Sequence, residues 1–181
     1  MKNIPLFALN FIRNPLRNAS IVPSSGAASR AMLEDIDFSS INTIVELGPG
    51  TGVFTAEIVK RSKPDAKILL IEIEPSYVRS LQKKFGNRII VEHASAHLLD
   101  SVLKKHGIEQ LDLIVSGLPF LAGAVGQGLL DSIKKHTGGK TIFRFFTYVP
   151  PIMKRIYKDL PIRKISFVSK NIPPMWIYGI N

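Results

Sequence analysis

The residues of this sequence best suited to chemistry form a glycine-rich turn preceded by an acid. Glu46 and Leu47 end an apolar, β-branched segment, and Gly48, Gly50 and Gly52 follow in alternate positions. Glycine adopts positive φ and has no side chain, so such a turn lets a ligand approach the backbone closely. Taken alone, the pattern fits either a ligand-binding turn or merely a tight connection between a strand and a helix.

A second acid follows one strand later. Glu72 lies 20 residues after Gly52, the position that holds a ribose hydroxyl pair in nucleoside-binding α/β folds. A carboxylate can accept two hydrogen bonds from such a diol. Glu74 is the competing acid. We favour Glu72, because the side chain of Glu74 points the same way only if the strand has already ended before it.

An alternation of strands and helices is needed to hold these acids in place. From residue 41 onward, apolar β-branched runs alternate with helical patterns, which indicates a doubly wound α/β fold with a mostly parallel sheet. The expected strands cover residues 41–47, 67–73, 88–92, 111–116, 141–148, 164–169 and 175–179, and the expected helices cover 27–33, 54–61, 76–85, 101–106, 122–136 and 152–160. No long helix separates the last two strands, so we expect them to form an antiparallel edge hairpin. Ligands bind at the carboxyl ends of such strands, near the switch point.

The length of 181 residues fits a single domain, with a Rossmann-like core over 41–181 and N-terminal helices over 1–40. No apolar run approaches the ~18 residues that a membrane span needs. A signal peptide is not expected, because no convincing cleavage site is present. Residues 4–14 are amphipathic if helical. Such a helix fits either a segment lying on a membrane surface or a lid over the ligand site.

The formal net charge is +10, from 24 Lys and Arg against 14 Asp and Glu. This excess indicates an anionic partner, either nucleic acid or an acidic membrane surface, although a solubilising surface is a third explanation. The chain has no cysteine, which excludes a disulfide framework, a Cys-ligated zinc site and a thiol nucleophile, and fits the cytoplasm. We expect no metal.

The segment from Glu46 to Gly52 resembles motif I of class I S-adenosylmethionine-dependent methyltransferases. A nicotinamide fingerprint would need a third glycine where Val53 stands. The resemblance implies S-adenosylmethionine as the cofactor, with Glu46 near its methionine end. It assigns the three glycines of the turn to backbone contact and Glu72 to the ribose.

The loop after the third strand is the expected adenine contact. Many class I enzymes carry an acid there, whereas this sequence has Ser95 and Ala96, of which Ser95 is the expected polar contact. His93 and His97 flank them, and we expect both to be surface or packing residues. Ser116, at the end of the fourth strand, is also assigned to cofactor binding.

Ser116 begins the block Ser-Gly-Leu-Pro-Phe, which ends at Phe120. Many amino-methylating enzymes carry Asn or Asp where Gly117 stands, and its carbonyl positions the amine of a flat base. Losing that acceptor costs about 1–3 kcal/mol for a buried group. Gly117 therefore counts against adenine as the substrate.

The block instead resembles the bacterial phospholipid N-methyltransferases, which convert phosphatidylethanolamine to phosphatidylcholine. The resemblance extends to short blocks over nearly the whole chain, at residues 14–15, 21–25, 146–148, 171–174 and 176–178. Two departures are Phe145, where glutamine is more usual, and the segment after Phe120, which lacks the expected Leu-Pro. The resemblance implies a phospholipid substrate and a peripheral position on the inner face of the membrane.

Aromatic faces stabilise ammonium cations, so Phe120 and Tyr148 are the expected catalytic residues. A core tyrosine at the end of a strand is an equally good interpretation of Tyr148. The expected membrane and substrate contacts of the N-terminal helix are Phe7, Phe11, Arg13 and Arg17, which would meet anionic lipid.

Two rival functions share some of these features. A ribosomal RNA adenine dimethylase-like enzyme carries motif I and the Leu-Pro-aromatic block and would explain the charge, but usually adds a C-terminal helical domain. A non-catalytic cofactor- or RNA-binding module is the other rival, with Gly117 and Phe145 as marks of lost activity. Nucleic acid is the less expected partner.

Overall fold

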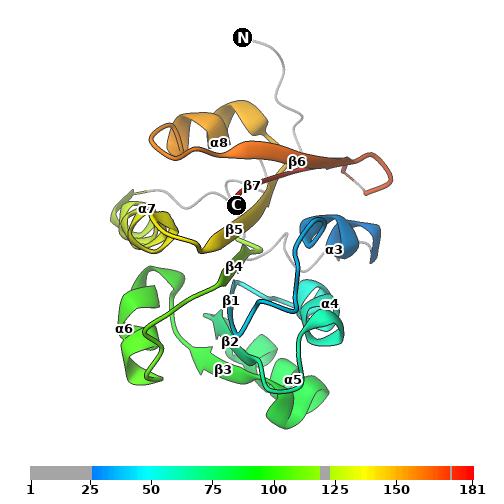
Figure 1. The fold of residues 1–181 in the computed structure, drawn as a ribbon, viewed down its shortest axis with the longest axis vertical. Helices are drawn as coiled ribbons and strands as arrows, with labels where there is room; N and C mark the ends of the chain where they lie inside the picture. The colour runs from blue at the N-terminus through cyan, green and yellow to red at the C-terminus, as the bar shows by residue number, and fades with distance from the viewer. Residues whose placement is uncertain (1–25, 119–122, 172) are drawn as a thin grey trace.

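A computed structural model describes residues 26–118, 123–171 and 173–181 (Figure 1). Its strands are β1 (Thr43–Leu47), β2 (Lys67–Glu72), β3 (Ile90–His93), β4 (Leu113–Ser116), β5 (Ile142–Thr147), β6 (Arg163–Val168) and β7 (Met175–Ile180). Its helices are α3 (Gly26–Met32), α4 (Val53–Arg61), α5 (Pro75–Phe85), α6 (Leu99–Lys105), α7 (Gly123–Thr137) and α8 (Pro150–Ile156), with 3₁₀ turns η1 (Gly86–Arg88) and η2 (Ala96–Leu98).

The seven strands form one sheet in the order β3-β2-β1-β4-β5-β7-β6. The five strands from β3 to β5 are parallel, and β7 is antiparallel to both β5 and β6. The order reverses between β1 and β4, which makes their carboxyl ends the switch point. The predicted α/β fold and the antiparallel edge hairpin are therefore confirmed.

Helices cover both faces of the sheet (Figure 1). The core on one face contains residues of α6, α7 and α8, and the core on the other contains residues of α3, α4 and α5. Strands β1, β2 and β4 lie between the two cores and are buried almost throughout. Strands buried on both faces are continuously apolar, which is why these segments show no alternation.

Helix boundaries differ from the predicted ones where proline or a 3₁₀ turn intervenes. The predicted helix 152–160 is α8, which begins at Pro150 and ends at Ile156. Proline fits the first turn of a helix because the N–H it lacks would have no helical partner there. The predicted helix 101–106 begins earlier, at Leu99, directly after η2.

The N-terminal region is described only from Gly26. Residues Ala28, Met32 and Leu33 are fully buried, so α3 and the turn after it belong to the core of the sheet. The predicted amphipathic helix, with Phe7, Phe11, Arg13 and Arg17, lies outside the described residues, as does Phe120. Within the described ranges, no helix has the length and apolar character needed to cross a bilayer.

Candidate active site

The glycine-rich turn connects β1 to α4 at the carboxyl edge of the sheet. Gly48, Gly50 and Gly52 all have positive φ, and the N–H of Gly52 donates to the carbonyl of Pro49 at 2.9 Å. A Cβ added to Gly50 would meet no atom within 4 Å. The turn is therefore held in a conformation that favours glycine, with free space beside Gly50 for a ligand.

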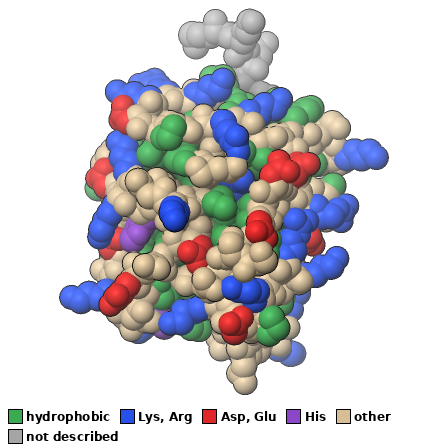
Figure 2. All heavy atoms as spheres, viewed as in Figure 1, with side chains coloured by type: hydrophobic (Ala, Val, Ile, Leu, Met, Phe, Trp, Pro, Cys, Tyr) green, Lys and Arg blue, Asp and Glu red, His purple; other side chains and the backbone are tan. Residues whose placement is uncertain are grey.

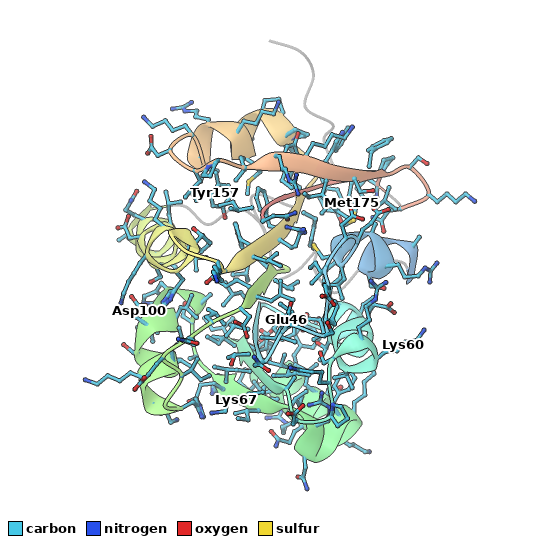
Figure 3. All side chains as sticks on the ribbon, in the orientation of Figure 1. Glu46, Lys60, Lys67, Asp100, Tyr157 and Met175 are labelled. Carbon is cyan, nitrogen blue, oxygen red and sulfur yellow. The ribbon has the colours of Figure 1, made fainter. Side chains whose placement is uncertain are left out.

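Glu46 is the fully buried acid that precedes the turn, and Figure 3 shows it in the middle of the molecule. Its Oε2 accepts a hydrogen bond of 2.6 Å from Oγ1 of Thr55, in the first turn of α4. Its Oε1 has no hydrogen-bond partner among the described residues. Burial raises the pKa of Glu46 to about 8; the hydrogen bond from Thr55 opposes the rise, and the charge of Glu72 adds to it.

Glu72 ends β2 and reaches across to the turn. Its Oε2 accepts a hydrogen bond of 3.0 Å from the backbone N–H of Gly50, and its Oε1 accepts one of 2.9 Å from that of Glu74. Each carboxylate oxygen has a second lone pair that a ribose hydroxyl can use. The carboxylate of Glu74 instead accepts hydrogen bonds from the N–H and hydroxyl of Ser76 and so caps α5. This geometry favours Glu72 as the ribose-binding acid.

The loop after β3 brings a hydroxyl to the same edge. Ser95 is half-buried, and its Oγ lies 2.8 Å from Nδ1 of His97, while Ala96 is buried at the start of η2. His93 is exposed, with Nε2 3.0 Å from the carbonyl oxygen of Ile73. Both histidines have local partners, which is consistent with the surface and packing roles expected of them.

The end of β4 packs directly against the glycine-rich turn. Ser116 is buried beside Leu47 in the sheet, and the N–H of Gly117 donates to the carbonyl of Leu47 at 2.9 Å. A Cβ built on Gly117 would lie 2.7 Å from the carbonyl oxygen of Gly48. Real Cβ atoms do not approach a backbone oxygen so closely. A side chain at Gly117 would therefore displace the backbone of the glycine-rich turn.

Tyr148 follows β5 at the same edge of the sheet. Its half-buried ring packs against that of Phe146, with a centroid separation of 5.4 Å. Burial raises the pKa of its hydroxyl, and a hydrogen bond with Asn171 partly offsets the rise. The hydroxyl is therefore neutral at physiological pH and suited to hydrogen bonding. Phe145 points to the other face, buried among Phe143, Tyr157 and Tyr178, and is a core residue.

These residues fit the predicted cofactor. The space at Gly50 accommodates a ligand against the backbone, Glu72 presents its carboxylate beside that space, and Oε1 of Glu46 is a buried acceptor without a donor among the described residues. An ammonium group, such as that of a bound amino acid, would supply such a donor. No group of three or more acids or histidines is placed to hold a metal ion in the part of the chain described.

Comparison with known proteins identifies the family. The family model described as ribosomal RNA adenine dimethylase matches residues 5–120. The chain belongs to the ribosomal RNA adenine dimethylase family. It is a methyltransferase that depends on S-adenosylmethionine, as the family match, the named relatives and the structural neighbours agree. The predicted enzyme class and cofactor are confirmed.

Named relatives in and around the family act on different substrates. An ornithine lipid N-methyltransferase from Singulisphaera acidiphila is 31% identical over 184 residues, which covers 98% of this chain and 95% of the relative. A probable dimethyladenosine transferase from Dictyostelium discoideum is 26% identical over 114 residues, covering 63% of this chain and 31% of the relative. The family therefore does not by itself decide the substrate.

Solved structures support the fold. A SAM-dependent methyltransferase from Aquifex aeolicus superposes with a TM-score of 0.61 at 13% identity, covering 94% of this chain and 96% of the other. Aeropyrum pernix fibrillarin, solved with natively bound S-adenosyl-L-methionine, gives a TM-score of 0.62 at 13% identity, covering 85% of this chain and 73% of the other.

Two residues of this region have roles that were not predicted from the sequence. Thr55 holds the buried Glu46 carboxylate, and its place nine residues after Glu46, in the first turn of the following helix, is the signal that indicates it. Asn171 joins Tyr148 to the turn before β7, since its side chain is hydrogen-bonded to Tyr148 and its Nδ2 donates to the carbonyl of Pro173 at 2.8 Å. Asn171 belongs to one of the short blocks that resemble the phospholipid enzymes, but its contact with Tyr148 appears only in the structure.

Proposed function

We propose that this methyltransferase N-methylates the amine of a membrane aminolipid, with phosphatidylethanolamine as the substrate. The observation that carries the proposal is the position of Gly117 against the carbonyl of Gly48. That contact leaves no room for the amide acceptor that would orient a planar adenine amine. A flexible aliphatic amine can instead reach the methyl donor without a fixed in-plane acceptor.

Similarity over the full chain supports a lipid substrate. The match with the ornithine lipid N-methyltransferase covers 98% of this chain, and so extends well past the end of the family model at residue 120. The region after residue 120 contains α7, β5, α8 and the β6–β7 hairpin, so the similarity to the lipid enzyme includes this half of the fold.

Bound S-adenosylmethionine supplies an electrophilic methyl group, and the protein residues position the reactants. Glu72 would accept hydrogen bonds from the ribose, and the backbone at Gly50 would lie against the cofactor. The attacking amine must be neutral; each transfer forms an N–C bond as the bond from sulfur to the methyl group breaks, and it leaves an ammonium cation. That cation loses a proton before the next transfer, and only the quaternary product is permanently charged. The rings of Tyr148 and Phe120 are proposed to stabilise that cation, by about 0.5–2 kcal/mol each. Most of the rate gain would come from alignment of the two reactants.

Transfer of labelled methyl groups from S-adenosylmethionine tests the proposal. The purified protein would be offered vesicles containing phosphatidylethanolamine, vesicles containing ornithine lipid, and ribosomal RNA. We expect methylation of phosphatidylethanolamine and none of RNA. Methylation of ornithine lipid alone would keep the class of reaction and correct the substrate, whereas methylation of RNA without lipid would overturn the proposal.

Adenine methylation in ribosomal RNA is the second candidate function. It is favoured by the family model and by the dimethyladenosine transferase relatives. The same assay distinguishes the two functions, since an RNA enzyme should methylate RNA in the absence of any lipid.

We also propose that the protein binds peripherally to the cytoplasmic face of the membrane, because its substrate would be embedded there. The charge excess fits this position. Figure 2 shows Lys and Arg side chains around much of the outline of one face, with hydrophobic side chains exposed between them.

A further inference from the structure

A groove between α7 and α8 lies outside the cofactor site. Its volume is about 640 Å³, within the range of small-molecule sites. Leu130 of α7 and Ile152 and Ile156 of α8 line it, and all three are partly buried. Gly126 also lines the groove and has no side chain to fill it. The groove thus offers an apolar floor that is only partly covered.

Cations also line this groove. Lys134 forms an ion pair of 3.2 Å with Asp159, and both residues line the groove. Arg155 and Lys158 also line it, are exposed, and have no ion-pair partner in the described part of the chain. The groove therefore combines an apolar floor with two cations available to a ligand.

The part of the sequence that contains most of the groove is also strongly basic. Residues 132–181 contain ten Lys and Arg but only one acid, Asp159, so they carry +9 of the net +10 charge. An anionic ligand would therefore approach this end of the molecule in a favourable field.

The groove and the cofactor site are separate but share one edge of the sheet. Helices α7 and α8 follow β4 and β5, so both begin at the carboxyl edge. Ile152 lies in the first turn of α8, whereas Arg155 and Lys158 lie further along the chain. A ligand with its anionic group at these cations would extend its chain toward the carboxyl edge and leave the cofactor turn free.

We propose that this groove binds an anionic membrane lipid, with one acyl chain on Leu130, Ile152 and Ile156 and the phosphate against Arg155 and Lys158. The apolar floor decides between lipid and RNA, because a ribose-phosphate chain gains nothing from buried aliphatic side chains, whereas an acyl chain gains from removing its surface from water. The site does not depend on which amine the enzyme methylates, so its test needs no methyl transfer.

Calorimetry with a monomeric lipid tests the site. The probe is lauroyl-lysophosphatidylglycerol below its micelle-forming concentration, titrated into the full chain. We expect one bound molecule per chain. Lauroyl-lysophosphatidylcholine lacks the net negative charge, and glycerol 3-phosphate and a single-stranded RNA decamer lack the acyl chain. Each of the three should bind at least tenfold more weakly.

Variants then locate the binding. Arg155→Glu with Lys158→Glu should weaken lysophosphatidylglycerol binding at least tenfold. Lys140→Glu with Lys154→Glu makes the same charge change at exposed residues outside the groove and should change the affinity less than twofold. Gly126→Leu should weaken binding at unchanged charge by filling the groove, whereas Ala124→Leu, exposed on the same helix, should not. Leucine has a higher helix propensity than glycine, so the Gly126→Leu variant should fold.

S-adenosylmethionine affinity within twofold of the parent value verifies that each variant is folded. Equal weakening by the two double charge variants would overturn the proposal, because it would show diffuse attraction rather than a site. RNA or glycerol 3-phosphate binding as tightly as the lipid, or no binding of the lipid by the parent protein, would overturn it as well.

Discussion

Glu72 and Glu74 are two neighbouring acids whose side chains make different contacts. Glu72 contacts the glycine-rich turn, whereas Glu74 caps α5. We predict that Glu72→Ala weakens S-adenosylmethionine binding at least tenfold, since losing a hydrogen bond to a charged group costs about 1.5–3 kcal/mol. Glu74→Ala is the matched control and should stay within twofold. Calorimetry that finds equal affinities in the two variants would remove Glu72 from the cofactor site.

Gly50 is the position where added bulk should exclude the cofactor without disturbing the core. A Cβ at this position would have no protein atom within 4 Å, but φ there is +55°. We predict that Gly50→Val abolishes measurable S-adenosylmethionine binding, since a β-branched side chain is strained at that φ and occupies the ligand space. Circular dichroism should still show a folded protein. Undiminished binding would place the cofactor elsewhere.

The buried Glu46 should make stability depend on pH. Its folded-state pKa of about 8 lies above the ordinary value of 4.5. Between these two pH values the folded protein therefore keeps a proton on Glu46 that the unfolded chain has released. Stability should therefore fall as pH rises from about 5 to 8, by up to about 1.4 kcal/mol per pH unit from this group. Urea unfolding at several pH values measures the slope, and Glu46→Gln should flatten it. An equal slope in the variant would show that other groups cause it.

Gly117 can be tested by restoring the residue that adenine methylation uses. Because its Cβ would lie 2.7 Å from the carbonyl oxygen of Gly48, Gly117→Asn should displace the cofactor turn. We predict at least tenfold weaker S-adenosylmethionine binding and no gain of RNA methylation. A variant that binds the cofactor normally and methylates RNA would show that the loop accommodates the amide, and that adenine is an accessible substrate.

At the scale of elements, the antiparallel pairing of β5 with β7 depends on Gly179. A Cβ there would clash with the carbonyl oxygen of Phe143 and would lie 2.7 Å from Nη1 of Arg144. Arg144 is itself fully buried, and its Nη1 donates to the carbonyls of Phe143 and Ile180. The guanidinium thus fills the space that a side chain at Gly179 would need.

We predict that Gly179→Ala lowers the free energy of unfolding by about 1–3 kcal/mol, the usual cost of overpacking. Gly139→Ala is the control, because a Cβ there meets nothing within 4 Å, and its effect should stay within about 0.5 kcal/mol. Urea denaturation measures both. Equal stabilities of the two variants would show that the hairpin shifts to accept the methyl group at no cost.

Residues 132–181 carry +9 of the net +10 charge, which bears on membrane binding by the whole molecule. Flotation with vesicles should increase with the fraction of anionic lipid and decrease, without vanishing, at high salt, since electrostatic attraction is screened and apolar burial is not. Phe7→Asp with Phe11→Asp should release the protein from vesicles if the N-terminal helix is the main anchor. Flotation of that variant at the parent level would assign the interaction to the basic C-terminal region instead.

The sequence by itself determined the fold class, the enzyme class and the cofactor, and it predicted Glu72 as the acid that binds the ribose. Each of these features can be recognised within a short stretch of sequence. An apolar strand precedes Gly48, the glycines follow in alternate positions, and Glu72 ends the next strand. Local sequence patterns are sufficient for these features, because the ligand site of a strand–turn–helix unit lies at the carboxyl end of its own strand. The antiparallel hairpin was also predictable, since no helix separates its strands.

Only the tertiary structure decided which residues meet across the sheet. The contact between Gly117 and Gly48 joins turns that follow β4 and β1, and the hydrogen bond of Tyr148 with Asn171 joins the end of β5 to the turn before β7. The groove between α7 and α8 likewise exists only once β4 and β5 are paired. Such contacts depend on the order of strands in the sheet, because strand order sets which chain-distant turns become neighbours, and no local periodicity encodes it.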